Sequence, residues 1–240
     1  MNGQKWAWCV VMTALFFIGP VFATFVILNS IALAYHSTAA FPFTTIFWLF
    51  AVWTLVTLPL TVFGAVAGRK MARNKFFPCK TNKIPREVPK LNWYERKWVV
   101  FTVTSLLAFS AIYVELHFLV STIWSVGSGS VMYSALLITT VLAALILSAA
   151  AVLFTYYTLT AENHRWQWRA YFAGASFGVL FMLYSAVFFL KSEMTGFLQG
   201  AFFFLYSGLA AFALALMLGY VSFASTMKFV VYIYSRVKVD

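Results

Sequence analysis

Glu115 is the only acidic residue inside one of the long apolar segments of this 240-residue sequence. A carboxylate surrounded by hydrocarbon is costly, so it marks a candidate site for an ion, a proton or the polar groups of a neighbouring helix. His117 and the hydroxyl of Tyr133 are candidate partners, although His117, two residues away, points to another helix face. The other interpretation is a carboxyl near a segment end, protonated or hydrogen-bonded to a neighbouring helix. This second interpretation is favoured, because a single carboxylate makes a poor proton relay.

Two patterns that suggest catalytic chemistry do not fit their surroundings. The run Gly174-Ala175-Ser176-Phe177-Gly178 has the spacing of a nucleophile elbow, but it lies in an apolar helical segment rather than a strand-to-helix turn. The next apolar segment contains no histidine that could serve as the base. The three histidines, His36, His117 and His164, lie in three different regions, so they cannot form a zinc or di-iron cluster. The sequence therefore predicts no enzyme activity, no metal and no cofactor.

The composition identifies the solvent of this chain as lipid. Hydrophobic residues make up 63% of the sequence and charged residues only 10%, whereas a soluble domain has about 25% charged residues. The net charge of +11 is concentrated between residues 69 and 97. A basic segment beside apolar segments is typical of contact with anionic lipid headgroups, so we expect membrane lipids as partners and no nucleic acid.

Six continuous apolar runs are long enough to cross a bilayer, which takes about 20 residues. They lie at about 6–34, 43–68, 98–123, 131–157, 171–190 and 197–223. Their unbroken apolar character excludes barrel strands, which alternate apolar and polar residues. The sequence therefore predicts an all-α polytopic membrane protein, with residues 1–240 forming a single membrane domain of six transmembrane helices. We expect the last helix to continue to about Ile233.

The distribution of basic residues predicts the orientation of these helices. The loop 69–97 holds most of the lysines and arginines, whereas the loops 35–42 and 124–130 have no charged residue. Because basic loops remain on the cytosolic side, we expect the loop 69–97, the turn 162–169, the tail 226–240 and both termini in the cytosol.

The first polar motif, Thr81–Pro89, lies in the basic loop. Its prolines are four residues apart, which opposes a helix and favours an extended strip. The strip is either a stiff spacer between two helices or a cytosolic docking strip for lipid or a partner. Its candidate docking residues are Thr81, Asn82, Ile84, Pro85, Arg86 and Pro89.

The second and third motifs lie in the other cytosolic segments. The turn Ala161–Arg169 has two tryptophans flanked by arginines, which suits the headgroup zone. Glu162 could pair there with Arg165 or Arg169. The interfacial turn residues that we single out are Glu162, Trp166, Trp168 and Arg169. In the tail, Asp240 offers a side-chain and a terminal carboxylate two positions from Lys238. This tail is either a solvated end or a sorting signal that a cytosolic adaptor protein recognises.

Taken together, the three motifs resemble the nonaspanins, the transmembrane-9 superfamily. The loop matches the family strip Thr-Asn-x-Ile-Pro-Arg-x-x-Pro at Thr81–Pro89, and the tail matches its ending Ile-Tyr-Ser-x-x-Lys-Val-Asp at Ile233–Asp240. The turn Ala161–Arg169 matches the family pattern Ala-Glu-Asp-x-x-Trp-x-Trp-Arg, except that Asn163 replaces the usual Asp. The motifs follow one another in the family's order along essentially the whole chain.

The resemblance implies the C-terminal six-span portion of a nine-span protein that also has a lumenal domain. It further implies a Golgi and endosomal location and a role in sorting, localisation or trafficking of other membrane proteins. Cargo membrane proteins would then be partners, with coatomer reading the tail at Lys238 and Asp240. Two alternatives stay open at this point: an ion or small-solute transporter or channel that uses Glu115, and a truncated product of a longer gene.

Glycines spaced four apart occur twice, at Gly64 and Gly68 and at Gly174 and Gly178. Such pairs let two membrane helices approach closely. They could pack within the bundle or receive helices of cargo proteins, and we expect packing within the bundle.

Overall fold

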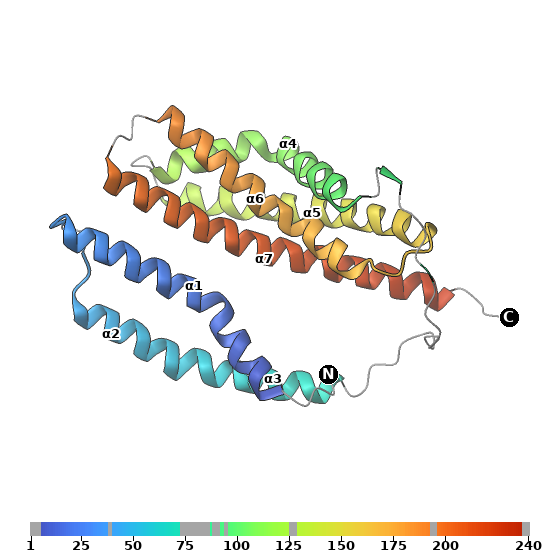
Figure 1. Ribbon diagram of the computed structural model, residues 1–240, viewed down its shortest axis with the longest axis horizontal. Coiled ribbons are helices and arrows are strands. Elements are labelled where there is room, and N and C mark those ends of the chain that lie inside the picture. Colours follow the sequence, from blue (N-terminus) through green and yellow to red (C-terminus); the bar gives the residue numbers. More distant parts are fainter. Residues whose placement is uncertain are drawn as a thin grey trace. The chain divides into compact units, whose positions relative to one another are not determined.

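The computed structural model describes residues 6–37, 40–72, 87, 92–93, 96–124, 129–192 and 196–236. The docking strip, with Thr81, Asn82, Ile84, Pro85, Arg86 and Pro89, and the tail residues Lys238 and Asp240 lie outside these described residues. The helices are α1 (Trp6–Ala34), α2 (Phe43–Val52), the π-helical turn η1 (Trp53–Thr57), α3 (Leu58–Ala72), α4 (Lys97–Trp124), α5 (Gly129–Thr160), α6 (Gln167–Lys191) and α7 (Phe197–Arg236), as Figure 1 shows.

The prediction of an all-α membrane protein with six spans is confirmed. Within the described ranges, six helical stretches are long and apolar enough to cross a membrane, with α2, η1 and α3 forming one of them. Inside a bilayer a helix satisfies its backbone hydrogen bonds internally, so long apolar runs become helices. Hydroxyl side chains fit such helices by donating to their own backbone, as Thr158 does to the carbonyl of Phe154 at 2.8 Å. The cytosolic orientation of the termini stays a prediction.

Several helices extend beyond the apolar runs from which they were predicted. α6 begins at Gln167 rather than near residue 171, α5 ends at Thr160 rather than near residue 157, and α7 continues past Ile233 to Arg236. An apolar run marks the length of chain that lipid covers. The helix continues into polar residues wherever no proline, glycine or other stop signal interrupts it.

The chain divides into two compact units, and each is described by itself. The first comprises residues 1–77 and 186–209, and thus α1 to α3 together with the end of α6 and the beginning of α7. The N–H of Phe41 donates to Asn29 Oδ1 at 2.8 Å, which links the start of the second span to α1. Figure 1 shows that α1 bends along its length, and Pro20 lies inside this helix. The expectation of a single membrane domain stays a prediction.

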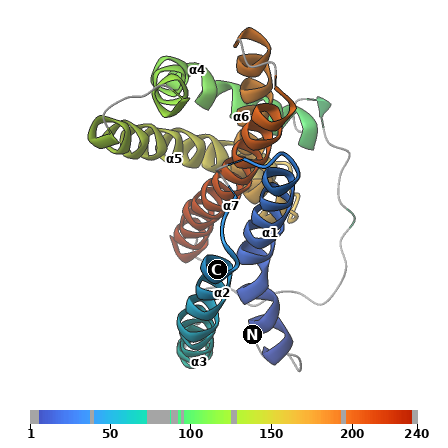
Figure 2. The same cartoon turned by 90° about the vertical axis from the view of Figure 1, so that its left-hand side faces the viewer.

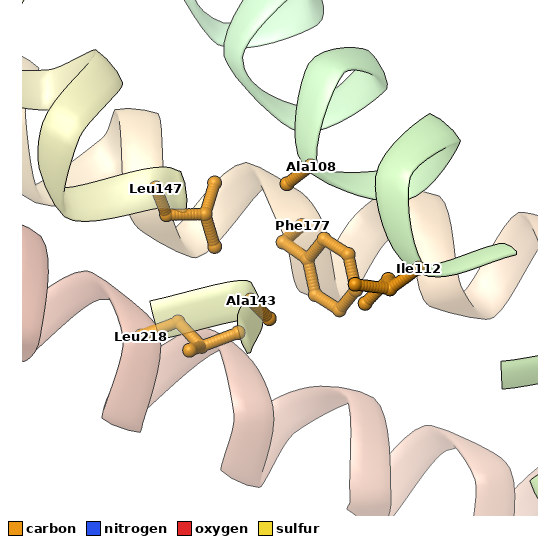
Figure 3. Packing of buried hydrophobic residues seen from close by; sticks show 6 residues of the cluster. All are labelled: Ala108, Ile112, Ala143, Leu147, Phe177 and Leu218. Atoms are coloured by element: carbon orange, nitrogen blue, oxygen red, sulfur yellow. The ribbon is translucent and has the colours of Figure 1, made fainter. Parts of the chain in front are cut away.

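The second unit comprises residues 78–185 and 210–240 and has a core to which four helices contribute. Figure 3 shows how the core side chains point toward one another. They are Ala108 and Ile112 of α4, Ala143 and Leu147 of α5, Phe177 of α6 and Leu218 of α7. Phe177 is the largest of them and is 1% exposed. This core joins α4, α5, α6 and α7 within the second unit.

Small residues let α6 approach α7 closely within this unit, and the two helices lie side by side in both views (Figures 1 and 2). A Cβ atom at Gly174 would contact the Ser222 side chain and come within 2.5 Å of the Leu218 carbonyl oxygen. At Gly178 it would come within 2.5 Å of the Ala211 carbonyl oxygen. Packing within the bundle is therefore confirmed for this pair.

The same spacing at Gly64 and Gly68 has a different environment. A Cβ atom at either glycine would meet nothing within 4 Å among the described residues. The expectation of packing within the bundle is therefore not met for this second pair.

Candidate functional site

The interfacial turn begins with a Schellman motif that ends α5. The N–H of Asn163 donates to the carbonyl of Thr158 at 3.0 Å, and the N–H of Glu162 donates to that of Leu159 at 2.9 Å. Glu162 has a φ of 57°, a left-handed conformation that usually favours glycine at this position. Its side chain is exposed. The expected ion pair between Glu162 and an arginine stays a prediction.

Asn163 then turns the chain toward α6. Its side chain is buried, with 3% exposure, and its Oδ1 accepts a hydrogen bond from the N–H of Arg165 at 2.9 Å. This is an Asx turn, which an asparagine or aspartate can make in place of a backbone turn. α6 opens directly afterwards, where the N–H of Ala170 donates to the carbonyl of Trp166 at 2.9 Å.

Replacing Asn163 with alanine is expected to lower the free energy of unfolding by about 1 kcal/mol, because the N–H of Arg165 loses its acceptor in this partly buried turn. The measurement is thermal unfolding of the purified chain in detergent, followed by circular dichroism. Asn163→Asp is the control, since it retains the oxygen acceptor and should lose less than Asn163→Ala. Equal stability of wild type and Asn163→Ala would contradict the assigned role of this side chain.

The two tryptophans of the turn have different environments, although the sequence presents them alike. Trp166 is buried, with 7% exposure, and its ring stacks on Phe223 of α7 with centroids 6.1 Å apart. Trp168 is 71% exposed and stacks on Phe172 one turn further along α6, at 5.8 Å. Trp166 therefore packs the turn against α7, whereas Trp168 faces outward as an interfacial indole does. Arg169 is half-buried and, with Trp168, lines a groove between α4 and α6.

Glu115 lies on the exposed side of α4, whereas its neighbour Leu116 is buried in the second unit. No hydrogen bond or ion pair joins Glu115 to another residue in the part of the chain that the structure describes. This position fits contact with lipid or another membrane helix. It does not assemble the chain of ionisable groups that a proton relay needs.

His117 belongs to an aromatic cluster that bridges α4 and α6. A hydrogen bond of 2.8 Å joins its Nδ1 to the hydroxyl oxygen of Tyr184. The Tyr184 ring also lies against Phe109 and Tyr113, at centroid distances of 5.6 and 5.9 Å. Sequence reasoning named His117 and Tyr133 as candidate partners of Glu115 and missed the bond between His117 and Tyr184. Nothing in the linear sequence indicates this partner, because 67 positions separate it from His117.

Ser176, the serine of the elbow-like run, makes hydrogen bonds within the helix bundle. Ser176 lies within helix α6 rather than in a turn. Its hydroxyl donates to the carbonyl of Ala173 at 2.7 Å and to that of Phe101 of α4 at 3.0 Å. These bonds make Ser176 a contact between two helices. Among the described residues, no group of three or more His, Cys, Asp or Glu side chains could hold a metal ion.

The six apolar helical stretches of membrane-spanning length among the described residues define a multi-pass α-helical integral membrane protein. The family model of Endomembrane protein 70 matches residues 1–197. Transmembrane 9 superfamily member 4 of Arabidopsis thaliana is 36% identical to the chain over 241 residues, and Transmembrane 9 superfamily member 1 of Bos taurus is 39% identical over 244 residues. The chain belongs to this family, the Transmembrane 9 superfamily.

Both matches cover the whole of this chain and 40% of the relative. The chain thus spans about two fifths of the length of these curated relatives. No solved structure matches it.

Proposed function

We propose that this chain acts in Golgi and endosomal membranes in the sorting, localisation or trafficking of other membrane proteins. The helix bundle would recognise the spans of cargo proteins laterally, within the plane of the membrane, while coatomer reads the cytosolic tail. The observation that carries this proposal is the ending Ile233–Asp240, which resembles the ending of the nonaspanins and lies in the region that the curated relatives match.

The length of α7 supports a tail that a soluble coat can reach. α7 has 40 residues, which at 1.5 Å per residue gives a helix about 60 Å long. A bilayer with its headgroups is only about 40–45 Å thick. The last turns of α7 would therefore project beyond the apolar core. There the guanidinium of Arg236 lies 5.6 Å from the Tyr232 ring centroid, and the residues that follow include Lys238 and Asp240.

The experiment compares the location of the chain with that of a Lys238→Ala, Asp240→Ala double variant. A tag within the loop 35–42 leaves the C-terminus free. Wild type is expected in the Golgi, and the double variant in later compartments of the secretory pathway. Arg236→Ala is the control, because it removes a charged side chain beside the Lys-x-Asp ending but preserves Lys238 and Asp240.

Identical locations of wild type and double variant would remove the tail from the proposed function. A control that moves as far as the double variant would show that the location does not depend specifically on the Lys-x-Asp ending. The exposed position of Glu115 gives no support to the transporter alternative.

A further inference from the structure

A groove of about 840 Å³ lies between α4 and α6 in the second unit. Lys97, the first residue of α4, and Arg169, the third residue of α6, line one end of it. Leu183 of α6 lines it 14 positions beyond Arg169, so the groove follows α6 for about 21 Å at 1.5 Å per residue. That length is comparable to one leaflet of the hydrocarbon core, about 15 Å.

The body of the groove is apolar even where its side chains bear hydroxyl groups. Thr102 donates to the carbonyl of Trp98 at 2.9 Å, and both Ser105 and Ser176 donate to that of Phe101, at 2.9 and 3.0 Å. Each of these hydroxyl donors is thus engaged with backbone. The Phe101 and Phe172 rings meet across the two helices at a centroid distance of 6.0 Å. A hydrocarbon chain suits such a surface better than a polar ligand does.

The end of the groove near Lys97 and Arg169 is positively charged, unlike the apolar body of the groove. No acidic residue is among the described residues that line the groove. The Lys97 amine lies 5.4 Å from the centroid of the Trp98 ring, and Trp98 and Trp168 are each 71% exposed. Two cations beside two exposed indoles form a headgroup-level site at the groove end that is expected to face the cytosol, where anionic lipids are enriched.

The distribution of charge along the groove favours a lipid over a protein helix. A phospholipid carries a phosphate at headgroup level and an acyl chain below it, which matches the two cations at one end of the groove and its apolar body. A transmembrane span that lay in the groove would bring no anion to Lys97 and Arg169 unless it carried an acidic residue at that level.

We propose that the groove between α4 and α6 binds an anionic phospholipid, with its phosphate between Lys97 and Arg169 and an acyl chain along Phe101, Phe172 and Val179. The cations provide charge-assisted hydrogen bonds to the phosphate. The aromatic floor packs the acyl chain. This site is independent of the proposed sorting role, since it requires neither cargo nor coatomer.

The test is a titration of the full chain, purified in detergent, with phosphatidylserine and with phosphatidylcholine of the same acyl chains, followed by native mass spectrometry. Wild type is expected to bind phosphatidylserine more tightly. The Lys97→Gln, Arg169→Gln double variant is expected to lose roughly tenfold or more in phosphatidylserine affinity, the loss that corresponds to about one charged hydrogen bond. The Lys97→Arg variant should retain the preference.

Two further variants keep the result interpretable. Arg165→Gln with Lys228→Gln removes the same charge from exposed positions outside the groove and should leave the preference unchanged. Ala175→Phe fills the groove without changing charge and should weaken both lipids. Undiminished binding by the Lys97→Gln, Arg169→Gln variant, or an equal loss in the charge-matched control, would overturn the proposal.

A photoreactive amino acid at Val179, which is 65% exposed in the groove, identifies the occupant in cells. Cross-linked phospholipid is the expected product. A cross-linked transmembrane segment of a protein would overturn the proposal in favour of a helix-binding groove. Because neither assay measures location, failure of the lipid site and failure of the sorting role can be told apart.

Discussion

Gly178→Ala is expected to lower the free energy of unfolding by about 2 kcal/mol, the usual cost of overpacking a close interface. The added Cβ would come within 2.5 Å of the Ala211 carbonyl oxygen and 2.7 Å of the Ala215 Cβ. Neither contact is the flexible end of a side chain, so α6 and α7 must move apart. The measurement is unfolding of the purified chain by SDS in mixed micelles, followed by circular dichroism.

Gly64→Ala is the matched control for this experiment. It is the same substitution in the same four-residue spacing, but its Cβ would meet none of the described residues within 4 Å. Alanine is also favoured over glycine in a helix by about 1 kcal/mol, so this variant should be as stable as wild type or slightly more stable. Equal losses at Gly64 and Gly178 would contradict the packing described for α6 and α7.

Trp166→Ala is expected to have a still larger effect, about 3 kcal/mol in the free energy of unfolding, as is typical of a buried aromatic truncated to alanine. The indole is 7% exposed and stacks on Phe223 with an interplanar angle of 15°. Its loss leaves a space between the interfacial turn and α7. Circular dichroism suits the measurement, because tryptophan fluorescence itself changes in this variant.

Trp168→Ala provides the comparison. With 71% of its surface exposed, this residue should change the free energy of unfolding by less than about 1 kcal/mol. It lines the lipid groove, however, so its loss is expected to weaken phospholipid binding in the titration described above. Similar stability losses at Trp166 and Trp168 would show that both act only as general membrane anchors.

The sequence by itself determined the class of this protein and the number of its spans. The length and apolar character of a run are local properties, and a bilayer turns such a run into a helix because a helix satisfies the backbone hydrogen bonds within the run itself. The distribution of charge and the order of the motifs could likewise be taken directly from the sequence. The ends of the helices were predicted less accurately, because α6 and α7 continue into polar residues where lipid no longer constrains the composition.

The tertiary structure decided which residues of each motif meet a partner. Gly64 and Gly178 belong to pairs of the same spacing, yet Gly178 lies against α7, whereas a Cβ at Gly64 would meet nothing within 4 Å in the part of the chain that the structure describes. Trp166 and Trp168 are two positions apart, yet one packs on α7 and the other faces outward. The hydrogen bond between His117 and Tyr184 joins residues 67 positions apart. Such outcomes depend on how each helix is rotated about its axis and which neighbours it packs against, and no local run of residues specifies that rotation when every face is apolar.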